Sequence, residues 1–260
     1  MKPRTRKDVT AAVAALALLG LLGLGLLLGL AFGGGGRTTP RAARQPSQPR
    51  QAGGTAKSFP PVVTLLATTH GAIPKFMRPG GPQTGKVPGS WHHARSMLPV
   101  IAKQPGWLKL QLAQRPNEST AWVLSRDVTL STTHYAIVLD LATTDLSLYR
   151  GGHKIFSAPV GVGTRQFPTP TGTFFAAFVA RAPVPAYGAF VMVTSAHSNV
   201  ISDWHSSGDA MVSIHGPLFS GRQIGTTGAR VSHGCIRMHE NDLLHLRQVP
   251  MGSPIFIVHS

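Results

Sequence analysis

The sequence predicts a mainly β protein with one short helix near its C-terminus, preceded by an N-terminal transmembrane helix. Three observations predict this fold. Many short apolar stretches are separated by turns that use the chain's 29 glycines and 21 prolines, as expected for strands joined by turns. Residues 9–32 carry no charge over 24 positions. Only residues 239–248 combine a polar start with the leucine spacing of a helix.

The N-terminal segment has the pattern of a membrane anchor. Residues 1–8 contain four basic residues and one acid, and they are predicted to form a cytoplasmic tail. Residues 9–32, about 36 Å long as a helix at about 1.5 Å per residue, would cross a bilayer core of about 30 Å as a transmembrane anchor or uncleaved signal. A cleaved signal is the alternative, although its apolar region is usually only about 7–15 residues long. The rest of the chain would then lie outside the cytoplasm, on the cell-wall side.

The chain is strongly basic, with a formal net charge of +16. Residues 33–61 form a Gly/Pro-rich basic linker that cannot bury enough surface to fold. Residues 62–260 still hold sixteen basic and eight acidic residues. Such a charge favours polyanionic surroundings, of which anionic lipid and anionic cell-wall polymers are examples. Nucleic acid is a poor fit, because the basic residues are scattered and no known DNA- or RNA-binding pattern occurs.

Residues 62–130 are predicted to form a small β module. Residues 107–112 alternate between apolar and polar side chains, as a half-buried strand does. The order GWLKLQL, then RPNEST, then AWVLSRDV resembles bacterial SH3-like domains. That resemblance implies wall binding or positioning of the domain that follows, and a spacer without a ligand is the alternative.

Residues 134–260 are predicted to form a second β-rich unit, a sandwich or capped barrel. A hairpin is expected from residues 145–149 and 154–160, around an Arg-Gly-Gly-His turn. The remaining predicted strands are residues 135–141, 172–180, 190–194, 213–215 and 255–258.

The single cysteine, Cys235, excludes a structural disulfide within the chain. A thiol is nucleophilic as thiolate, and a nearby imidazole can take its proton. His233 lies two residues away and His215 twenty, and the residues alone do not decide which is the base. Gly234 permits a tight turn that aims backbone N–H groups at one point, as an oxyanion hole requires. Arg237 is close enough in sequence to neutralise a substrate carboxylate.

The motifs around these residues resemble the L,D-transpeptidase catalytic-domain family. Its signature is a His-Gly followed at this spacing by Ser/Thr-His-Gly-Cys, an apolar residue and Arg or Asn, here His215-Gly216 and then residues 232–237 (SHGCIR). Residues 168–174 (PTPTGTF) are also typical, and the resemblance extends over roughly residues 134–259. It implies a β-rich acyltransferase that joins peptidoglycan peptide stems by 3-3 cross-links through a cysteine thioester, without a metal or other cofactor.

The resemblance also implies roles for single residues. Cys235 would be the nucleophile, with His215 as general base and acid, oriented by the carbonyl of Gly216. The oxyanion hole would use the backbone N–H groups of His233, Gly234 and Cys235. Residues 181–208 are expected to cover the site as a lid. The residues expected to shape the site or bind the stem are Ser232, His233, Gly216, Arg237 and, on this lid, Tyr187 and Trp204.

Other interpretations of the same residues remain open. Water or a protein amine in place of a second stem would make the enzyme an L,D-carboxypeptidase or a protein-to-wall ligase. A degenerate site would leave a non-catalytic wall-binding protein. A zinc hydrolase could use His215, His233, Cys235 and His239, which are suitable ligands. No Asp or Glu precedes Glu240 in that cluster to serve as its base.

Overall fold

The computed structural model describes residues 59–204, 208–226 and 228–260. This part of the chain is mainly β with one short α-helix, which confirms the predicted fold class for the described residues only. The predicted cytoplasmic tail 1–8, the predicted anchor 9–32 and nearly all of the predicted linker 33–61 lie outside the described residues. Within the described residues, no helix has both the length and the hydropathy needed to span a bilayer.

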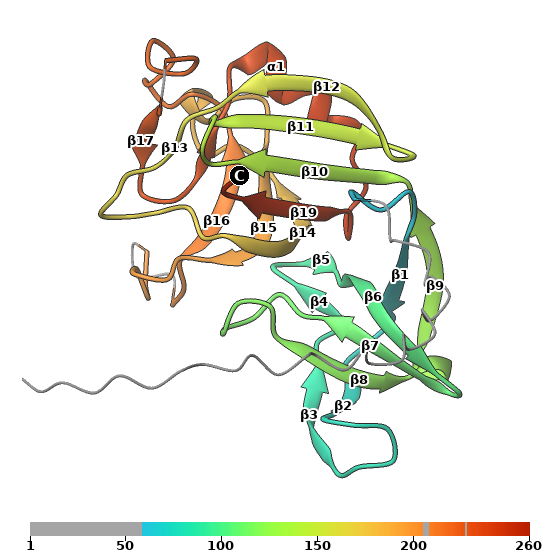
Figure 1. Cartoon of the computed structure of the whole chain (residues 1–260). Coiled ribbons are helices and arrows are strands. Elements are labelled where there is room, and N and C mark those ends of the chain that lie inside the picture. Colours follow the sequence, from blue (N-terminus) through green and yellow to red (C-terminus); the bar gives the residue numbers. More distant parts are fainter. Residues whose placement is uncertain (1–58, 205–207, 227) are drawn as a thin grey trace, which may run out of the picture. The chain divides into compact units, whose positions relative to one another are not determined.

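The N-terminal strands form a seven-stranded sheet in the order β3-β2-β8-β7-β6-β1-β9 (Figure 1). All of its pairings are antiparallel. Its strands are β1 (Thr64–Thr69), β2 (Ile73–Phe76), β3 (Gln83–Val87), β6 (Met97–Gln104), β7 (Trp107–Gln111), β8 (Thr120–Leu124) and β9 (Val128–Thr133), and a small ribbon adds β4 (Ser90–Trp91) and β5 (Ala94–Arg95). A 3-10 turn, η1 (Ser125–Asp127), precedes β9. The likeness of residues 62–130 to SH3-like domains stays a prediction.

The C-terminal strands form an eight-stranded sheet in the order β12-β11-β10-β19-β14-β15-β16-β18 (Figure 1). Two of its pairings, β10 with β19 and β16 with β18, are parallel. Its strands are β10 (Tyr135–Asp140), β11 (Asp145–Arg150), β12 (His153–Pro159), β14 (Gly172–Ala180), β15 (Val191–His197), β16 (Met211–His215), β18 (Ile236–Arg237) and β19 (Pro254–Val258), and a parallel pair adds β13 (Val162–Gly163) and β17 (Arg230–Ser232). The predicted hairpin forms β11 and β12.

The predicted helix at residues 239–248 is divided in two. Residues Glu240–Leu244 form α1, and residues His245–Gln248 continue as the 3-10 turn η3. Val249 is extended and precedes Pro250. A proline disfavours helical backbone at the residue before it, which gives a physical reason for the end of the helical segment at this position.

Strand β14 connects the two hydrophobic cores. Phe174 and Ala176 face a core built within the C-terminal sheet and its helix. Phe175 and Ala177, which point the opposite way along the strand, pack with buried residues of the N-terminal sheet such as Leu110. The N-terminal strands therefore share a core with β14 and β15, and all described residues belong to one compact unit.

The loop between β7 and β8, residues 112–119, also contacts the start of β14. The N–H of Thr173 donates a 2.8 Å hydrogen bond to Glu118 Oε1. The side-chain amide of Gln111, at the end of β7, donates to the Thr173 carbonyl. These polar contacts fix the 112–119 loop beside the C-terminal sheet.

Candidate active site

The parallel pairing of β16 with β18 brings the two halves of the sequence motif together. His215 ends β16 and is the register partner of Arg237 in β18. Cys235 comes directly before β18. One small pocket is lined by Tyr187, Ser198, Ile201, Trp204, Ala210, Met211, Val212, His215, Leu218, Ser232, His233, Cys235 and Arg237. Seven of the predicted site residues are in this lining, and Gly216 and Gly234 adjoin it in sequence.

His215 is a buried imidazole, only 2% exposed. Its Nδ1 lies 2.8 Å from the Gly216 carbonyl oxygen. A carbonyl only accepts hydrogen bonds, so Nδ1 carries the proton and Nε2 is left as the basic nitrogen. Burial, assisted by the charge of Arg237, lowers the pKa of His215 to about 4, against the opposing effect of the Gly216 carbonyl. The imidazole is therefore neutral near pH 7.

Close backbone packing around Gly216 holds Tyr187 against His215. The N–H of Gly216 donates a 2.7 Å hydrogen bond to the carbonyl of Tyr187, in the 3-10 turn η2 (Pro185–Tyr187). A Cβ on residue 216 would lie 2.7 Å from the backbone nitrogen of Gly188, so only glycine fits there. The Tyr187 and His215 ring centroids are 4.7 Å apart. Tyr187 is thus placed as a wall of the site.

Internal hydrogen bonds fold the segment 232–235 into a tight turn, called the Cys235 turn below. Ser232 Oγ donates to the Cys235 carbonyl at 2.6 Å and accepts the N–H of Gly234 at 3.1 Å. Gly234 has a φ of +122°, which side-chain-bearing residues rarely adopt. Its N–H, which the resemblance assigns to the oxyanion hole, is already engaged by Ser232. The role of the Gly234 N–H in an oxyanion hole stays a prediction, and the N–H groups of His233 and Cys235 are the other candidates.

Thr169 is a site residue that sequence reasoning missed. Its buried hydroxyl donates a 2.8 Å hydrogen bond to the Gly234 carbonyl and accepts a 2.9 Å one from the Gly163 N–H. A Cβ on residue 163 would lie 2.2 Å from the Phe167 carbonyl, so this approach requires glycine. The available signal was the Pro-Thr-Pro stretch at residues 168–170, but it gives no partner for the hydroxyl. Thr169 therefore braces the Cys235 turn.

The thiol of Cys235 is predominantly protonated at rest. Burial raises the pKa of the thiol, and a hydrogen bond with the Ser213 backbone and the charge of Arg237 only partly oppose this. A thiol with a raised pKa needs a base to take its proton as it attacks. The site thus holds a neutral thiol and a neutral imidazole rather than an ion pair.

Arg237 has an unused hydrogen-bond donor beside the thiol. Its backbone makes two hydrogen bonds of 2.8 Å with Gly161, which fix its position. Its Nε is buried and has no hydrogen-bond partner within the described part of the chain. An unused guanidinium donor is suited to a carboxylate ligand.

His233 and Trp204 lie at the rim of the pocket. The exposed ring of His233 is 4.7 Å from Phe167 and 5.3 Å from the 41% exposed Trp204, between centroids. The expected lid at residues 181–208 needs a correction, because it contains β15 (Val191–His197), a fully buried central strand. Only the described segments on either side of β15 contribute pocket walls, through Tyr187 and through residues 198–204.

No group of three or more His, Cys, Asp or Glu side chains is arranged to hold a metal ion in the residues that the structure describes. Glu240, the first carboxylate after the motif, accepts a 2.8 Å hydrogen bond from the Ala189 N–H. The zinc interpretation stays a hypothesis, which removal of metal by a chelator tests.

Comparison with known proteins gives one family match and several relatives. Residues 134–257 match the model of the YkuD family, the L,D-transpeptidase catalytic domain. Among solved structures, an L,D-transpeptidase from Mycobacterium smegmatis aligns with a TM-score of 0.39 and 18% identity, over 63% of this chain and 91% of that one.

Two Bacillus proteins are similar in sequence. The YkuD protein of Bacillus subtilis, a provisionally named L,D-transpeptidase, is 31% identical over 125 residues, 48% of this chain. Its counterpart in Bacillus licheniformis is 32% identical over 126 residues, 47% of this chain. The chain covers 65% of the length of each relative. By the family model and these relatives, residues 134–257 are similar to the L,D-transpeptidase catalytic domain of the YkuD family.

Proposed function

We propose that this chain is a peptidoglycan L,D-transpeptidase that forms 3-3 cross-links through a thioester on Cys235. The observation that carries the proposal is the pocket in which the thiol, the buried imidazole of His215 and the unused donor of Arg237 come together. The three groups match the needs of acyl transfer from a peptide: a nucleophile, a proton carrier and a cation for a carboxylate.

In the first half-reaction, His215 Nε2 accepts the thiol proton as Sγ attacks the stem carbonyl on the L-centre side of the diamino acid. The N–H groups of His233 and Cys235 stabilise the oxyanion that forms. Collapse of this intermediate breaks the C–N bond, and protonated His215 gives its proton to the amine of the departing D-Ala. The product is a thioester between Cys235 and the donor stem.

The raised pKa of the Cys235 thiol and the lowered pKa of the His215 imidazole favour a proton transfer that occurs together with the attack of Sγ on the carbonyl. A separated thiolate and imidazolium would be costly in this buried site, because burial disfavours the charged form of each group. In the second half-reaction, the side-chain amine of a second stem attacks the thioester while neutral His215 takes a proton from it. The C–S bond then breaks, and protonated His215 returns its proton to Sγ, which restores the thiol.

The experiment is to incubate the full-length protein in detergent with disaccharide-tetrapeptides and to analyse the muropeptides by mass spectrometry. The expected products are free D-Ala and a dimer linked between two diamino acids, with Cys235→Ala as the inactive control. Tripeptide without dimer would replace the proposal by carboxypeptidase activity. Substrate binding without turnover would replace it by a non-catalytic wall-binding protein.

We also propose that residues 9–32 anchor the chain in the membrane, with the catalytic domain on the cell-wall side. The support is the uncharged 24-residue run that follows the basic N-terminus. The basic folded part would then be suited to anionic wall polymers. Cell fractionation with N-terminal sequencing tests this: we expect an intact N-terminus in the membrane fraction, and a start after residue 32 would show a cleaved signal.

A further inference from the structure

We infer that Arg115 and Asn117, in the 112–119 loop of the N-terminal sheet, are positioning residues for the pocket wall that carries Trp204. Through this wall they would set how well the donor is bound, an inference that rests on the proposed function. The wall is defined here as residues 198–204 and 208–210, and is called the Trp204 wall.

The Trp204 wall lines the pocket but contains no strand or helix in its described residues. Its pocket-lining members are Ser198, Ile201, Trp204 and Ala210. It closes on itself through two backbone hydrogen bonds, from the Ser198 N–H to the Ala210 carbonyl at 2.8 Å and from the Trp204 N–H to the Asp209 carbonyl at 2.9 Å. Segments without regular structure have low local stability, so their geometry depends on contacts from outside.

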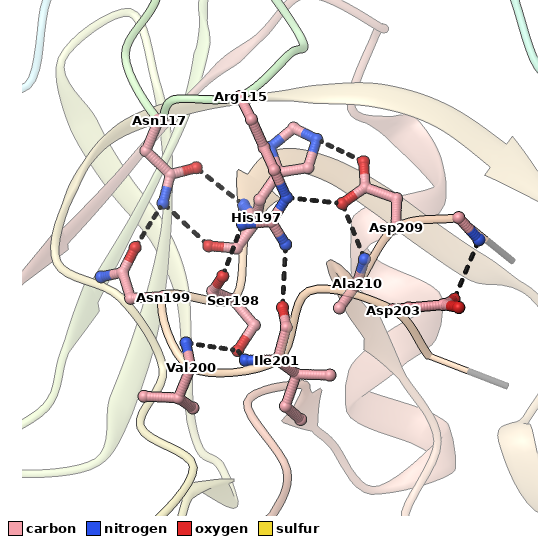
Figure 2. Close-up of polar contacts among 11 residues, drawn as sticks. Arg115, Asn117, His197, Ser198, Asn199, Val200, Ile201, Asp203, Asp209 and Ala210 are labelled. Atoms are coloured by element: carbon pink, nitrogen blue, oxygen red, sulfur yellow. Dashed lines mark hydrogen bonds and ion pairs between the residues drawn. The ribbon is translucent and has the colours of Figure 1, made fainter. Parts of the chain in front are cut away.

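Arg115 supplies three such contacts, as Figure 2 shows. Its Nη1 donates to the Ser198 carbonyl at 2.8 Å and its Nη2 to the Ile201 carbonyl at 2.9 Å. Its Nε pairs with Asp209 Oδ1 at 2.9 Å. One rigid guanidinium therefore joins both arms of the wall. A lysine would keep the charge but could not reproduce the three directions.

Asn117 fixes the point where β15 ends and the wall begins. Its Nδ2 donates to the His197 carbonyl at 2.8 Å, and its Oδ1 accepts the His197 N–H at 2.8 Å (Figure 2). The same Nδ2 donates to Asn199 Oδ1 at 3.0 Å. The buried His197 ring also lies against Asp209, with its Nε2 3.0 Å from Asp209 Oδ2, although this approach does not have hydrogen-bond geometry.

These contacts act on geometry more than on folding. The side chains of Arg115 and Asp209 are 39% and 27% exposed, and ion pairs of this kind add little to stability. The carbonyls that Arg115 binds belong to Ser198 and Ile201, two residues that line the pocket. Loss of the guanidinium should therefore change the shape of the wall, and with it the affinity for a ligand, while the Cys235 turn stays intact.

The test measures acylation of the full-length protein by meropenem over a range of concentrations, with Arg126→Lys as the matched control. Arg126 lies in the turn η1 between β8 and β9; its side chain is 80% exposed and its Nε is 3.9 Å from Asp127 Oδ1. We expect Arg115→Lys to raise the half-saturating concentration about tenfold with a maximal rate within about threefold of wild type. Alkylation of Cys235 by iodoacetamide, which needs no wall, should stay unchanged.

A double-mutant cycle separates positioning from a general structural role. If Arg115 acts through Trp204, then Arg115→Lys should add little to the loss caused by Trp204→Phe. Asn117→Asp, which keeps the acceptor for the His197 N–H and loses both donations, should shift saturation in the same direction. It serves as the second variant if Arg115→Lys folds poorly.

Three results would overturn the inference. The first is that Arg115→Lys and Asn117→Asp have the same half-saturating meropenem concentration as Arg126→Lys, which would show that neither residue affects binding. Losses that simply multiply in the double variant would show that Arg115 acts independently of Trp204. A wild-type protein that alkylates normally but neither acylates nor turns over peptide stems would remove the proposed function, and this inference with it.

Discussion

The Cys235 turn and the Trp204 wall face the same pocket but are held in different ways. The turn is built from its own hydrogen bonds, from Ser232 to its neighbours, with one additional bond from Thr169 outside the turn to the Gly234 carbonyl. The wall is held by Arg115, whose partners lie 83, 86 and 94 positions away in the sequence. From this difference we expect mutations in the turn to change the chemical step and mutations around the wall to change binding.

The largest effect is expected within the turn, from Cys235→Ala. The variant should lose all turnover, because no other group on the turn can form the thioester, while folding stays normal since only one sulfur atom is removed. Muropeptide analysis gives the turnover and circular dichroism the fold. Cross-linking at the wild-type level by a folded variant would remove the thiol from the mechanism.

His215→Ala should be the next most severe change. Loss of the proton carrier is expected to lower the acylation rate about 10²–10⁴-fold, at least as much as His233→Ala does. The reason is that His215 is buried with its Nδ1 bound to Gly216, whereas His233 is exposed beside Trp204. Stopped-flow acylation of both variants decides the order. If His233→Ala were inactive and His215→Ala acylated at a nearly normal rate, His233 rather than His215 would be the general base.

The zinc interpretation predicts a comparably large loss on chelation. We expect incubation with EDTA to leave turnover unchanged, because acyl transfer by a thiol and an imidazole needs no metal. Turnover is measured before chelation, after it, and after zinc is returned. Turnover that is lost with the chelator and restored by zinc would support the zinc interpretation instead.

A smaller loss of stability and of acylation rate is expected from Thr169→Val, which tests whether Thr169 stabilises the Cys235 turn from outside. The nearly isosteric valine leaves the buried Gly163 N–H and Gly234 carbonyl without this partner, at a cost of about 1–3 kcal/mol each. We expect lower stability in urea and roughly tenfold slower acylation. Thr171→Val, an exposed threonine of the same stretch, is the control. Equal behaviour of the two variants would show that Thr169 has no special role.

The smallest expected effect is on the pH dependence of the free energy of unfolding. The pKa of His215 is lowered to about 4 by burial, from an ordinary 6.5. Between these values the unfolded chain binds a proton that the folded chain does not, so stability is fully present above pH 6.5 and falls as the pH drops toward 4. His215 alone should account for about 2 kcal/mol between pH 7 and pH 5.

Urea unfolding at several pH values measures this dependence, and His215→Gln should flatten it. Burial also lowers the pKa of His197, which adds a dependence of the same sign in the Gln variant. Identical slopes for the wild type and His215→Gln would mean that the His215 imidazole is not held neutral by burial.

The sequence predicted the parts of the site that depend on local motifs. The hairpin of β11 and β12, the short helical segment and the nearness of His215 to Cys235 follow from turn signals, helix signals and the family motif. The lid predicted at residues 181–208 is wrong where it includes β15 (Val191–His197), whereas the strand predicted at residues 190–194 is confirmed as part of β15.

The contacts that shape the site were beyond sequence reasoning. Nothing near Thr169 in the sequence shows that its hydroxyl reaches Gly163 and Gly234, and the hydrogen bond from the Gly234 N–H to Ser232 depends on the geometry of the turn. Arg115 lies in a polar turn of ordinary composition, and its partners are set by the packing of one sheet against the other. Contacts between side chains and distant backbone leave no local pattern.

The most direct test of the account is to locate the acyl group. The protein is treated with meropenem and its intact mass is measured by mass spectrometry. It is then digested with trypsin to release residues 231–237, which contain both Ser232 and Cys235. Fragmentation of this peptide assigns the bonded atom. We expect one adduct, on Cys235, and none in Cys235→Ala. An adduct on Ser232, or none on a protein whose Cys235 still reacts with iodoacetamide, would contradict it.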